Sequence, residues 1–185
     1  MVNTDTHTGA SFSLKNRLLR VLWGIAYFVF FKFSPRPLHG WRSFILKCFG
    51  AKVGKGVHVY PGVIIWAPWN LILKDHCGIA SGVNLYSQGV ITVGKKAVIS
   101  QGSYICTGTH DYTKTGFPLY TLPITIGDDT WVAADVFIHP GVTIGHGCVI
   151  GARSVVTKNM PEWMVCAGFP CKVIKERTIV NRDRN

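Results

Sequence analysis

Acidic residues are scarce in this sequence of 185 residues. Nine Asp and Glu stand against 20 Lys and Arg, which gives a formal net charge of +11. Only 16% of the residues are charged and 48% are apolar, which argues against general disorder. Long helical patterns are few, whereas glycine occurs 20 times, and this combination favours a β architecture with many tight turns. The basic balance suits an anionic partner such as a phosphate-rich cofactor, a nucleic acid or a membrane surface.

Disulfide and metal signatures are also missing. No pair of the six cysteines has the spacing C-x-x-C, and scattered, unpaired cysteines are typical of a reducing compartment. The sequence has no close H-x-x-x-x-H pair, whereas a zinc site on a repeat fold needs three converging histidines. Lys and Arg are not clustered with stacking aromatics as nucleic-acid binding requires. We therefore predict a cytoplasmic protein without a metal site and without a nucleic-acid partner.

The N-terminal region has an apolar helical pattern but no segment long enough to cross a membrane. Residues 1–13 are small and polar and are predicted to be a disordered tail. Residues 14–37 have the spacing of a helix, and Pro35 and Pro37 end it. Its fully apolar run from Val21 to Phe31 spans about 17 Å, which is too short for a bilayer. One face of this helix is made of aliphatic residues at spacings of three and four: Leu14, Leu18, Val21, Leu22, Ile25 and Val29.

Two interpretations of this helix stay open. It packs on its own domain or a neighbouring subunit, or it lies in a membrane interface, where aromatic and basic side chains are favoured. A second short apolar segment follows at residues 41–51.

From residue 53 the sequence repeats every six residues. An aliphatic residue stands at position i of fifteen successive turns: Val53, Val59, Ile65, Leu73, Ile79, Leu85, Val93, Ile99, Ile105, Ile126, Val132, Ile138, Ile144, Ile150 and Val156. Period six is the mark of a parallel β-helix, in which three short strands make one triangular coil of about 18 residues. We predict an all-β fold of about five such coils, preceded by an N-terminal helical segment.

Other positions of the repeat follow a weaker rule. A small or β-branched residue is expected to point inward at i+4, as at Cys77, Thr109 and Cys148, whereas Trp69, Gly89 and Met160 depart from it. Gly or Ala often follows i, and we expect glycine there to supply a positive φ for a tight turn. The register slips by two residues near 71–72 and 91–92, where a corner should bulge, and by fifteen at 111–125.

The slip of fifteen residues predicts a loop over 111–125 that leaves one corner of the coil. A smooth solenoid has no concave pocket, and an extruded loop makes one. His110 stands where the loop leaves, at an outward-facing position, and an imidazole can act as a general base near neutral pH. Its neighbour Asp111 could hold the imidazole tautomer. From the residues alone, a surface histidine without a role stays an open alternative.

The stretches "TGTHD", "LPITIGDDTWVAADVFIHPGVTIGHGCVIGARSVVTKNMP" and "VCAGFPCKVIKE" resemble the hexapeptide-repeat acetyltransferases, in the branch of the maltose and galactoside O-acetyltransferases. With the segment "SLKNRLLRVLW", the chain looks most like the colanic-acid-type O-acetyltransferases of bacterial exopolysaccharide assembly. The resemblance implies a left-handed β-helix over residues 53–161, an N-terminal tail and cap over 1–52, and a C-terminal cap over 162–185.

The resemblance also implies the chemistry. Family members are homotrimers that bind acetyl-CoA in a groove between adjacent subunits. A histidine at the position of His110 takes the proton from an acceptor hydroxyl, which attacks the thioester directly, and a backbone N–H stabilises the oxyanion. The positions that match the family's cofactor-binding residues are Ala134, Ala152, Thr157, Lys158, Lys172 and Lys175.

The acceptor is less defined by the resemblance than the cofactor. Asn84 and Tyr86 lie one coil before His110, and with Asp111 they are the candidates for binding a saccharide. Trp66 and Trp69 could be sugar platforms, subunit contacts or membrane anchors. The predicted function is transfer of acetyl from acetyl-CoA to a sugar hydroxyl, free or lipid-linked, in the cytoplasm or at the cytoplasmic face of the inner membrane.

Four alternatives were weighed against this function. A serine acetyltransferase would need a larger helical N-terminal domain, but an amine or another small hydroxyl compound remains possible as acceptor. A γ-class carbonic anhydrase is disfavoured by the histidine spacing. A non-catalytic scaffold would need neither His110 nor a CoA groove.

Overall fold

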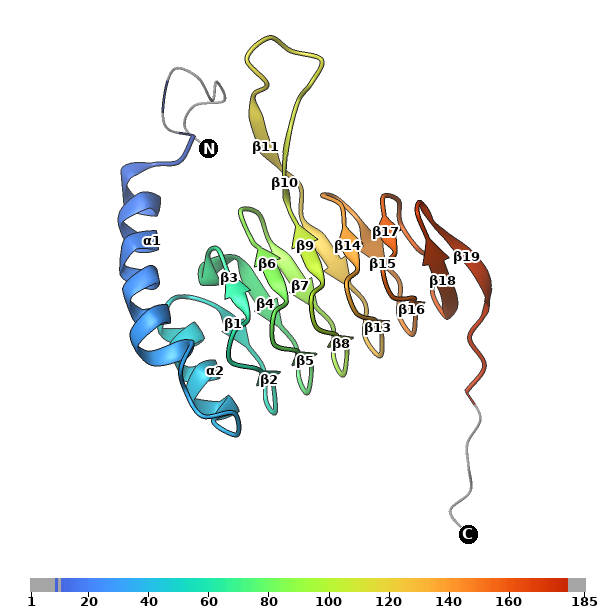
Figure 1. The fold of residues 1–185 in the computed structure, drawn as a ribbon, viewed down its shortest axis with the longest axis horizontal. Coiled ribbons are helices and arrows are strands. Elements are labelled where there is room, and N and C mark those ends of the chain that lie inside the picture. Colours follow the sequence, from blue (N-terminus) through green and yellow to red (C-terminus); the bar gives the residue numbers. More distant parts are fainter. Residues whose placement is uncertain (1–8, 10, 180–185) are drawn as a thin grey trace.

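The computed structural model describes residue 9 and residues 11–179 of the chain. Most of the predicted tail at residues 1–13 and the last six residues of the predicted C-terminal cap lie outside the described residues. The chain winds as a left-handed parallel β-helix of about six turns, with helices at its N-terminal end and a hairpin that projects from its side (Figure 1). The predicted fold class is confirmed.

Three parallel sheets form the walls of the triangular solenoid. Sheet A consists of β1 (Lys52–Val53), β4 (Leu71–Leu73), β7 (Ile91–Val93), β12 (Ile124–Ile126) and β15 (Thr143–Ile144). Sheet C consists of β3 (Ile64–Ile65), β6 (Asn84–Tyr86), β9 (Tyr104–Cys106), β14 (Phe137–Ile138) and β17 (Val155–Val156). Sheet B consists of β2 (His58–Val59), β5 (Gly78–Ile79), β8 (Val98–Ile99), β13 (Trp131–Val132), β16 (Val149–Ile150), β18 (Met164–Gly168) and β19 (Cys171–Glu176).

The C-terminal end of the solenoid is closed by a change of strand direction. β18 pairs in parallel with β16, so it adds a sixth parallel strand to sheet B. β19 then turns back and pairs antiparallel with β18.

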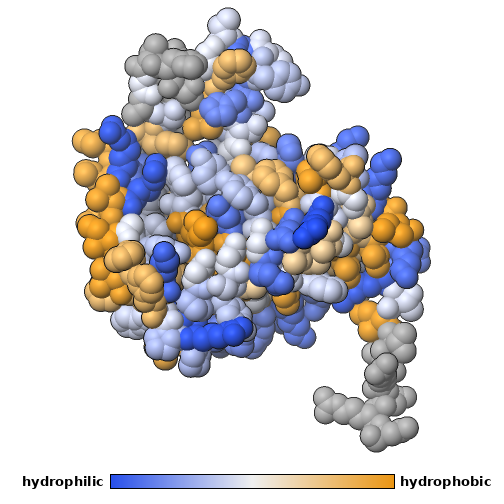
Figure 2. Space-filling view, viewed as in Figure 1, coloured by the Kyte–Doolittle hydropathy of each residue, from blue (hydrophilic) through white to orange (hydrophobic). Residues whose placement is uncertain are grey.

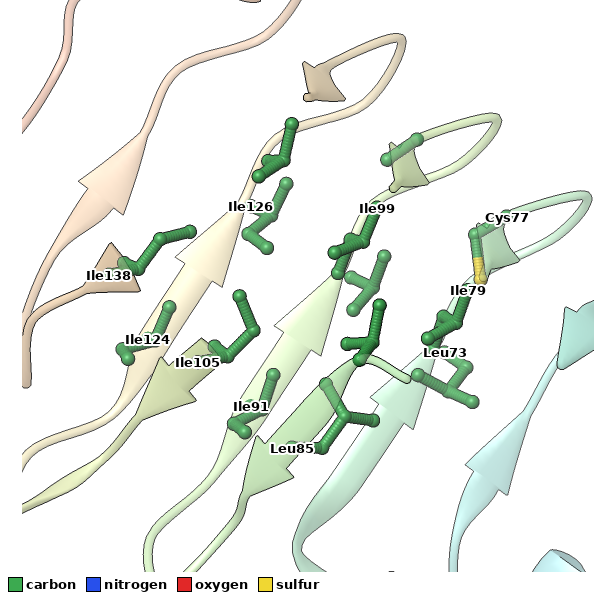
Figure 3. Close-up of a cluster of buried hydrophobic side chains, with 14 of the residues drawn as sticks. Leu73, Cys77, Ile79, Leu85, Ile91, Ile99, Ile105, Ile124, Ile126 and Ile138 are labelled. Carbon is green, nitrogen blue, oxygen red and sulfur yellow. The ribbon is translucent and has the colours of Figure 1, made fainter. Parts of the chain in front are cut away.

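The predicted aliphatic positions form the core. Fourteen of the fifteen i residues are buried and Val53 is partly buried. Their side chains point into the solenoid and stack from coil to coil (Figure 3). Cys77 lies among them, and burial raises the pKa of its thiol to about 12, so it is core filler as predicted. Stacking buries each coil's inner face, which no single coil could bury alone.

The glycines after position i have a different role from the predicted one. The residue with positive φ stands at i+3, and it is often not glycine, as Asp129 and Asp135 show. Gly127, at i+1, is needed because the next coil approaches closely: a Cβ there would lie 2.6 Å from the backbone carbon of Gly145. The predicted reason for glycine at i+1 was therefore wrong, since its backbone φ is ordinary and its lack of a side chain is what matters.

The corner between sheets C and A is wider in the first coils. Here the buried residue stands at i+2 rather than i+4, and the three such residues are Ala67, Ser87 and Thr107. The Ser87 hydroxyl accepts from the Ala67 N–H at 3.0 Å and donates to the Ala67 carbonyl at 2.9 Å. Thr109, predicted to point inward, lies on the hairpin instead. The two-residue slips thus come from a corner with its own polar core.

Two helices cover the first coil. α1 (Leu14–Ala26) continues into the π-helix η1 (Tyr27–Phe31), and α2 (His39–Cys48) packs against β1 and β2. A short 3₁₀ helix, η2 (Pro68–Asn70), lies in the wide corner. Trp23 and Phe31 are buried, and the Trp23 indole N–H donates to the Ile65 carbonyl at 2.8 Å. All six residues of the predicted apolar face of α1 are exposed, so this helix packs on its own domain through the opposite side.

Candidate functional site

The predicted loop is a β-hairpin with a tight end. β10 (Gly108–His110) pairs antiparallel with β11 (Leu119–Thr121), with His110 opposite Leu119. The hairpin leaves the corner between sheets C and A, and the coil resumes at β12, which pairs with β7. Only residues 111–118 form the connecting loop, because residues 119–121 form a strand and residues 124–126 already belong to sheet A. The projecting part is therefore more rigid than a loop of fifteen residues.

His110 is exposed at the end of β10, and its ring has a defined partner. Its Nδ1 lies 2.6 Å from the Phe117 carbonyl oxygen. A carbonyl can only accept a hydrogen bond, so Nδ1 must carry the proton, and the lone pair of the neutral ring is then on Nε2. Phe117 has a φ of +45°, an unusual conformation for a bulky residue, which aims its carbonyl back toward β10. The hairpin thus fixes the tautomer that a general base requires.

Asp111 does not hold the imidazole. Its carboxylate accepts from the Thr113 hydroxyl at 2.6 Å and from the Thr113 N–H at 3.1 Å, and it lies 3.3 Å from Lys114 Nζ. The hydrogen bond from the Thr113 hydroxyl lowers the pKa of Asp111 below its usual value. The prediction that Asp111 orients His110 was wrong, because its side chain closes the turn of the loop and a backbone carbonyl orients the ring.

Asn84 and Tyr86 meet in a pocket between α1 and the outer face of sheet C. The pocket has a volume of about 590 Å³. The Asn84 Oδ1 atom is buried and has no hydrogen-bond partner among the described residues. The Tyr86 hydroxyl accepts from the Gln88 amide at 2.7 Å, and burial raises its pKa. An amide oxygen beside aromatic faces is suited to a polar ring with hydroxyl groups.

Sequence reasoning missed two arginines in this pocket. Arg17 and Arg20 of α1 line it together with Trp66, and none of the acidic residues that the structure describes does. The Arg20 guanidinium lies 4.2 Å from the centroid of the Trp66 ring. Arg20 precedes Trp23 by three residues, so the two side chains lie on the same face of the helix. The burial of Trp23 against the coils therefore places Arg20 near the coils as well. Trp69 lies elsewhere, packed against the core beside Gly50.

The base of the hairpin lies beside one residue of the pocket, Tyr86. Gly108, two residues before His110, lies against Tyr86 and Gln88: a Cβ on Gly108 would collide with the Gln88 amide oxygen and lie 3.4 Å from Tyr86 Cε1. His110 itself is not part of the pocket lining within one chain. Gly108 therefore connects the predicted base to the predicted acceptor residues without a direct contact between them.

The predicted cofactor-binding residues fall on two different corners. Ala134 and Ala152 occupy equivalent turns of successive coils at the corner between sheets B and C, where the Arg153 N–H donates to the Ala134 carbonyl at 2.9 Å. Thr157 and Lys158 are exposed at the corner between sheets C and A, the corner from which the hairpin leaves.

The two predicted lysines lie on the last strand of sheet B. Lys172 and Lys175 are exposed on β19, opposite Ala167 and Val165 of β18. One face of the solenoid, sheet C, thus separates Thr157 and Lys158 from the other four residues. A single chain does not bring the predicted cofactor-binding residues together on one corner.

Neither the possible metal ligands nor the cysteine thiols of the described chain form a recognisable reactive group. Within the described part of the chain, no group of three or more His, Cys, Asp or Glu side chains is arranged to hold a metal ion. All six cysteines are free, and burial raises the pKa of Cys166 to about 11. A thiol that stays protonated at neutral pH is a poor nucleophile.

Comparison with known proteins places the chain in a family. A family model described as Bacterial transferase hexapeptide (six repeats) matches residues 123–158. The putative colanic acid biosynthesis acetyltransferase WcaF of Escherichia coli (strain K12) is 49% identical over 156 residues, which is 84% of this chain and 86% of that protein.

Two solved structures are similar over most of their length. A maltose O-acetyltransferase from Clostridium difficile 630 has a TM-score of 0.81 and 27% identity, with 90% of each chain covered. A galactoside acetyltransferase in complex with coenzyme A has a TM-score of 0.78 and 27% identity, with 91% of this chain and 86% of that chain covered.

The chain belongs to the hexapeptide-repeat acetyltransferases. The family predicted from the sequence is confirmed, and with it an enzyme that uses acetyl-CoA as its acyl donor.

Proposed function

We propose that this enzyme transfers acetyl from acetyl-CoA to a hydroxyl group of a saccharide in bacterial exopolysaccharide biosynthesis. The observation that carries the proposal is the ring of His110, whose Nδ1 is tied to the Phe117 carbonyl. This leaves Nε2 as a base on a hairpin whose first residue touches the pocket of Asn84 and Tyr86. The similarity to a colanic acid biosynthesis acetyltransferase supports the saccharide acceptor.

In the proposed mechanism the acetyl group moves in one attack. His110 Nε2 takes the proton of the acceptor hydroxyl as its oxygen attacks the thioester carbonyl carbon. A backbone N–H stabilises the oxyanion of the tetrahedral intermediate. The intermediate expels the CoA thiolate, which takes the proton from the imidazolium, so the products are the acetyl ester and free CoA. The Phe117 carbonyl stabilises the imidazolium while it exists.

The acceptor is proposed to occupy the pocket beside α1. Asn84 would bond a sugar hydroxyl through its unpartnered Oδ1, and Tyr86 would face the sugar ring. Asp111 is ionised at neutral pH because its pKa is lowered, and its carboxylate at the hairpin tip could accept from a further hydroxyl.

We propose a homotrimer with acetyl-CoA between adjacent subunits. The separation of Ala134 and Ala152 from Thr157 and Lys158 by sheet C supports this arrangement, because two corners from neighbouring subunits can line one groove. The ammonium groups of Lys172 and Lys175 would meet CoA phosphates as point charges. This assembly would complete a cofactor site that one chain holds only in parts.

The acceptor saccharide is proposed to be attached to a lipid at the cytoplasmic face of the inner membrane. No helix in the described residues is both long enough and apolar enough to span a bilayer. An enzyme acting on such an acceptor would therefore reach it by peripheral contact.

The test is CoA release from acetyl-CoA with a panel of free and lipid-linked hexoses. His110→Ala should lower acceptor-dependent release by about 10²–10⁴-fold, because it removes the general base. His76→Asn is the control at another histidine, since His76 is exposed in the turn between β4 and β5 and has a φ of +58° that asparagine tolerates, and it should keep the wild-type rate. Equal rates for wild type and His110→Ala would remove His110 as the base. No release and no CoA binding by wild type would contradict the proposed function.

A further inference from the structure

The outer side of the N-terminal helices is an apolar surface without a partner in the described chain. We define the helical apolar face as the six aliphatic residues of the predicted face, which lie in α1 and η1, together with Phe28, Phe33, Trp41 and Phe44. Their side chains are 43% to 68% exposed. Hydrophobic atoms run along the edge of the molecule over α1 (Figure 2). Apolar patches of this kind on soluble proteins mark interaction sites.

This face is not a core surface left open by loose packing. The opposite side of α1 and η1 already covers the first coil, with Trp23 3% exposed and Phe31 fully buried. Trp23 makes an edge-to-face contact with Phe49 of the cap and donates to the Ile65 carbonyl, so this side of the helix is packed against the domain. The run from Val21 to Phe31 is apolar on all sides. One side packs on the first coil, and the described chain supplies nothing that covers the other side.

The charge of the protein is concentrated in this same region. Residues 6–74 contain ten of the 20 Lys and Arg and none of the nine Asp and Glu. They therefore contribute +10 of the net charge of +11, and the rest of the chain is almost neutral. Lys15 and Arg17 flank the start of the helical apolar face, and Lys32 and Arg36 follow η1. The partner that this surface fits is apolar in its interior and anionic at its surface.

A second basic hollow lies beside α2. It has a volume of about 480 Å³ and is lined by Lys47, Lys55 and His58, with Phe44 of the helical apolar face at its edge. Within the described part of the chain, no acidic residue lines it, and the buried Ser43 hydroxyl in it has no hydrogen-bond partner. An acidic headgroup could lie here while an acyl chain meets Phe44.

We infer that α1, η1 and α2 dock the enzyme on an anionic lipid bilayer, with the helical apolar face in the interface and the basic side chains at the headgroups. The helix from Leu14 to Phe31 is 18 residues long, about 27 Å, and lies in the membrane plane rather than across it. The Phe and Trp residues occupy the interfacial layer, where such side chains are favoured. Acidic lipids attract each Lys or Arg that lies close to the membrane surface.

Docking would also place the acceptor pocket at the membrane surface. Val21 belongs to the helical apolar face and also lines the pocket of Asn84 and Tyr86, and Arg17 stands at the same border. A saccharide on a lipid anchor could enter the pocket while its lipid stays in the bilayer. This consequence rests on the proposed function, whereas the docking itself does not.

The experiment is co-sedimentation of the full chain with vesicles of phosphatidylcholine alone or with 30% phosphatidylglycerol. Wild type should bind the anionic vesicles and not the neutral ones, and 0.5 M NaCl should weaken binding by screening. Leu18→Ser with Ile25→Ser should lower the vesicle partition coefficient by about 10-fold or more. Lys15→Glu with Lys32→Glu should lower it to a similar extent, but only on anionic vesicles.

Matched controls separate docking from other causes. Ile179→Ser and Lys96→Glu change exposed residues of the same types away from the helices, and they should bind like wild type. CoA release with a water-soluble acceptor should be unchanged in all four variants, so a failure of the proposed chemistry leaves the docking result readable. Wild type that ignores anionic vesicles would overturn the inference. The inference would also be overturned if the two double variants of the helices bound vesicles as wild type does. It would be overturned as well if those double variants changed the oligomeric state measured by light scattering.

Discussion

The coils and the N-terminal helices use the same residue types in opposite ways. Ile99, in the second strand of the third coil, is fully buried, whereas Ile25 on α1 is 58% exposed. Each coil is held by neighbours on both sides, and its glycines mark places where the next backbone leaves no room. The helices touch one neighbour only and keep an apolar side free. In the coils, the position of a residue in the repeat determines whether it is buried. In the N-terminal helices, burial of the outer side depends on a binding partner.

The largest expected effect compares two isoleucines. Ile99→Ala removes buried methyl groups from the stack and should lower the free energy of unfolding by about 2–5 kcal/mol. Ile25→Ala should change it by less than about 0.5 kcal/mol. Urea denaturation followed by circular dichroism measures both. A large loss for Ile25→Ala would break the comparison, because it would mean that a subunit covers this face in solution.

Two glycines should respond with opposite sign. Gly127→Ala places a methyl group against the backbone of the next coil and should lower the free energy of unfolding by about 1–3 kcal/mol. Gly24→Ala meets nothing within 4 Å on α1 and should raise it by about 0.5–1 kcal/mol through helix propensity. Denaturation curves of the two variants sharpen the comparison. Loss of stability in both would count against the view that α1 has free space on its outer side.

Gly108 tests the border between the coils and the hairpin. Gly108→Ala should push Gln88 and Tyr86 aside and lower kcat/KM by about 10- to 100-fold, since a small displacement misplaces reacting groups. Gly40→Ala, with nothing within 4 Å, is the control and should keep wild-type activity. Steady-state kinetics with a melting curve distinguish misplacement from unfolding. Unchanged kcat/KM in Gly108→Ala would show that the pocket and the hairpin act independently.

The smallest effect concerns the tip of the hairpin. Thr113→Val removes the hydroxyl that donates to Asp111, so the pKa of Asp111 should rise toward its usual value. Because the folded pKa is lowered, the contribution of Asp111 to stability is present above the pKa of the unfolded chain and is lost as the pH falls through the folded value. NMR titration of the carboxyl carbon checks the shift. Thr115→Val, in the same loop, should leave it in place.

Much of the fold could be predicted because the inward positions recur every six residues and only aliphatic side chains fill them. The wide corner could not be predicted in the same way. Ser87 and Thr107 are core residues whose hydroxyls bond the backbone, and a pattern that counts apolar residues does not find them. The role of Gly127 also escaped, since close approach between coils leaves no mark on the local turn.

The site was predictable in its residue types rather than in its contacts. His110 was predictable as a candidate base because the six-residue repeat stops at this residue. The partner of its ring was not predictable, because it is a backbone carbonyl, which has no signature in a sequence. Asp111 was the nearer acid along the chain and proved to be engaged by Thr113. Arg17 and Arg20 line one pocket with Asn84, which lies more than sixty residues away in the sequence, and the pattern of this helix does not tell which side will face the coils.

The hairpin enters and leaves the solenoid at one corner, and β12 pairs with β7 as though nothing had been inserted between the third and fourth coils. Its own pairing, between β10 and β11, is closed on itself. The length of each coil is therefore fixed by the coils next to it, whereas the length of the hairpin is not. Residues added to the hairpin would lengthen the projection beside Tyr86 and Gln88 while the stack beneath kept its register. The shape of the hairpin can thus change independently of the stability of the coils.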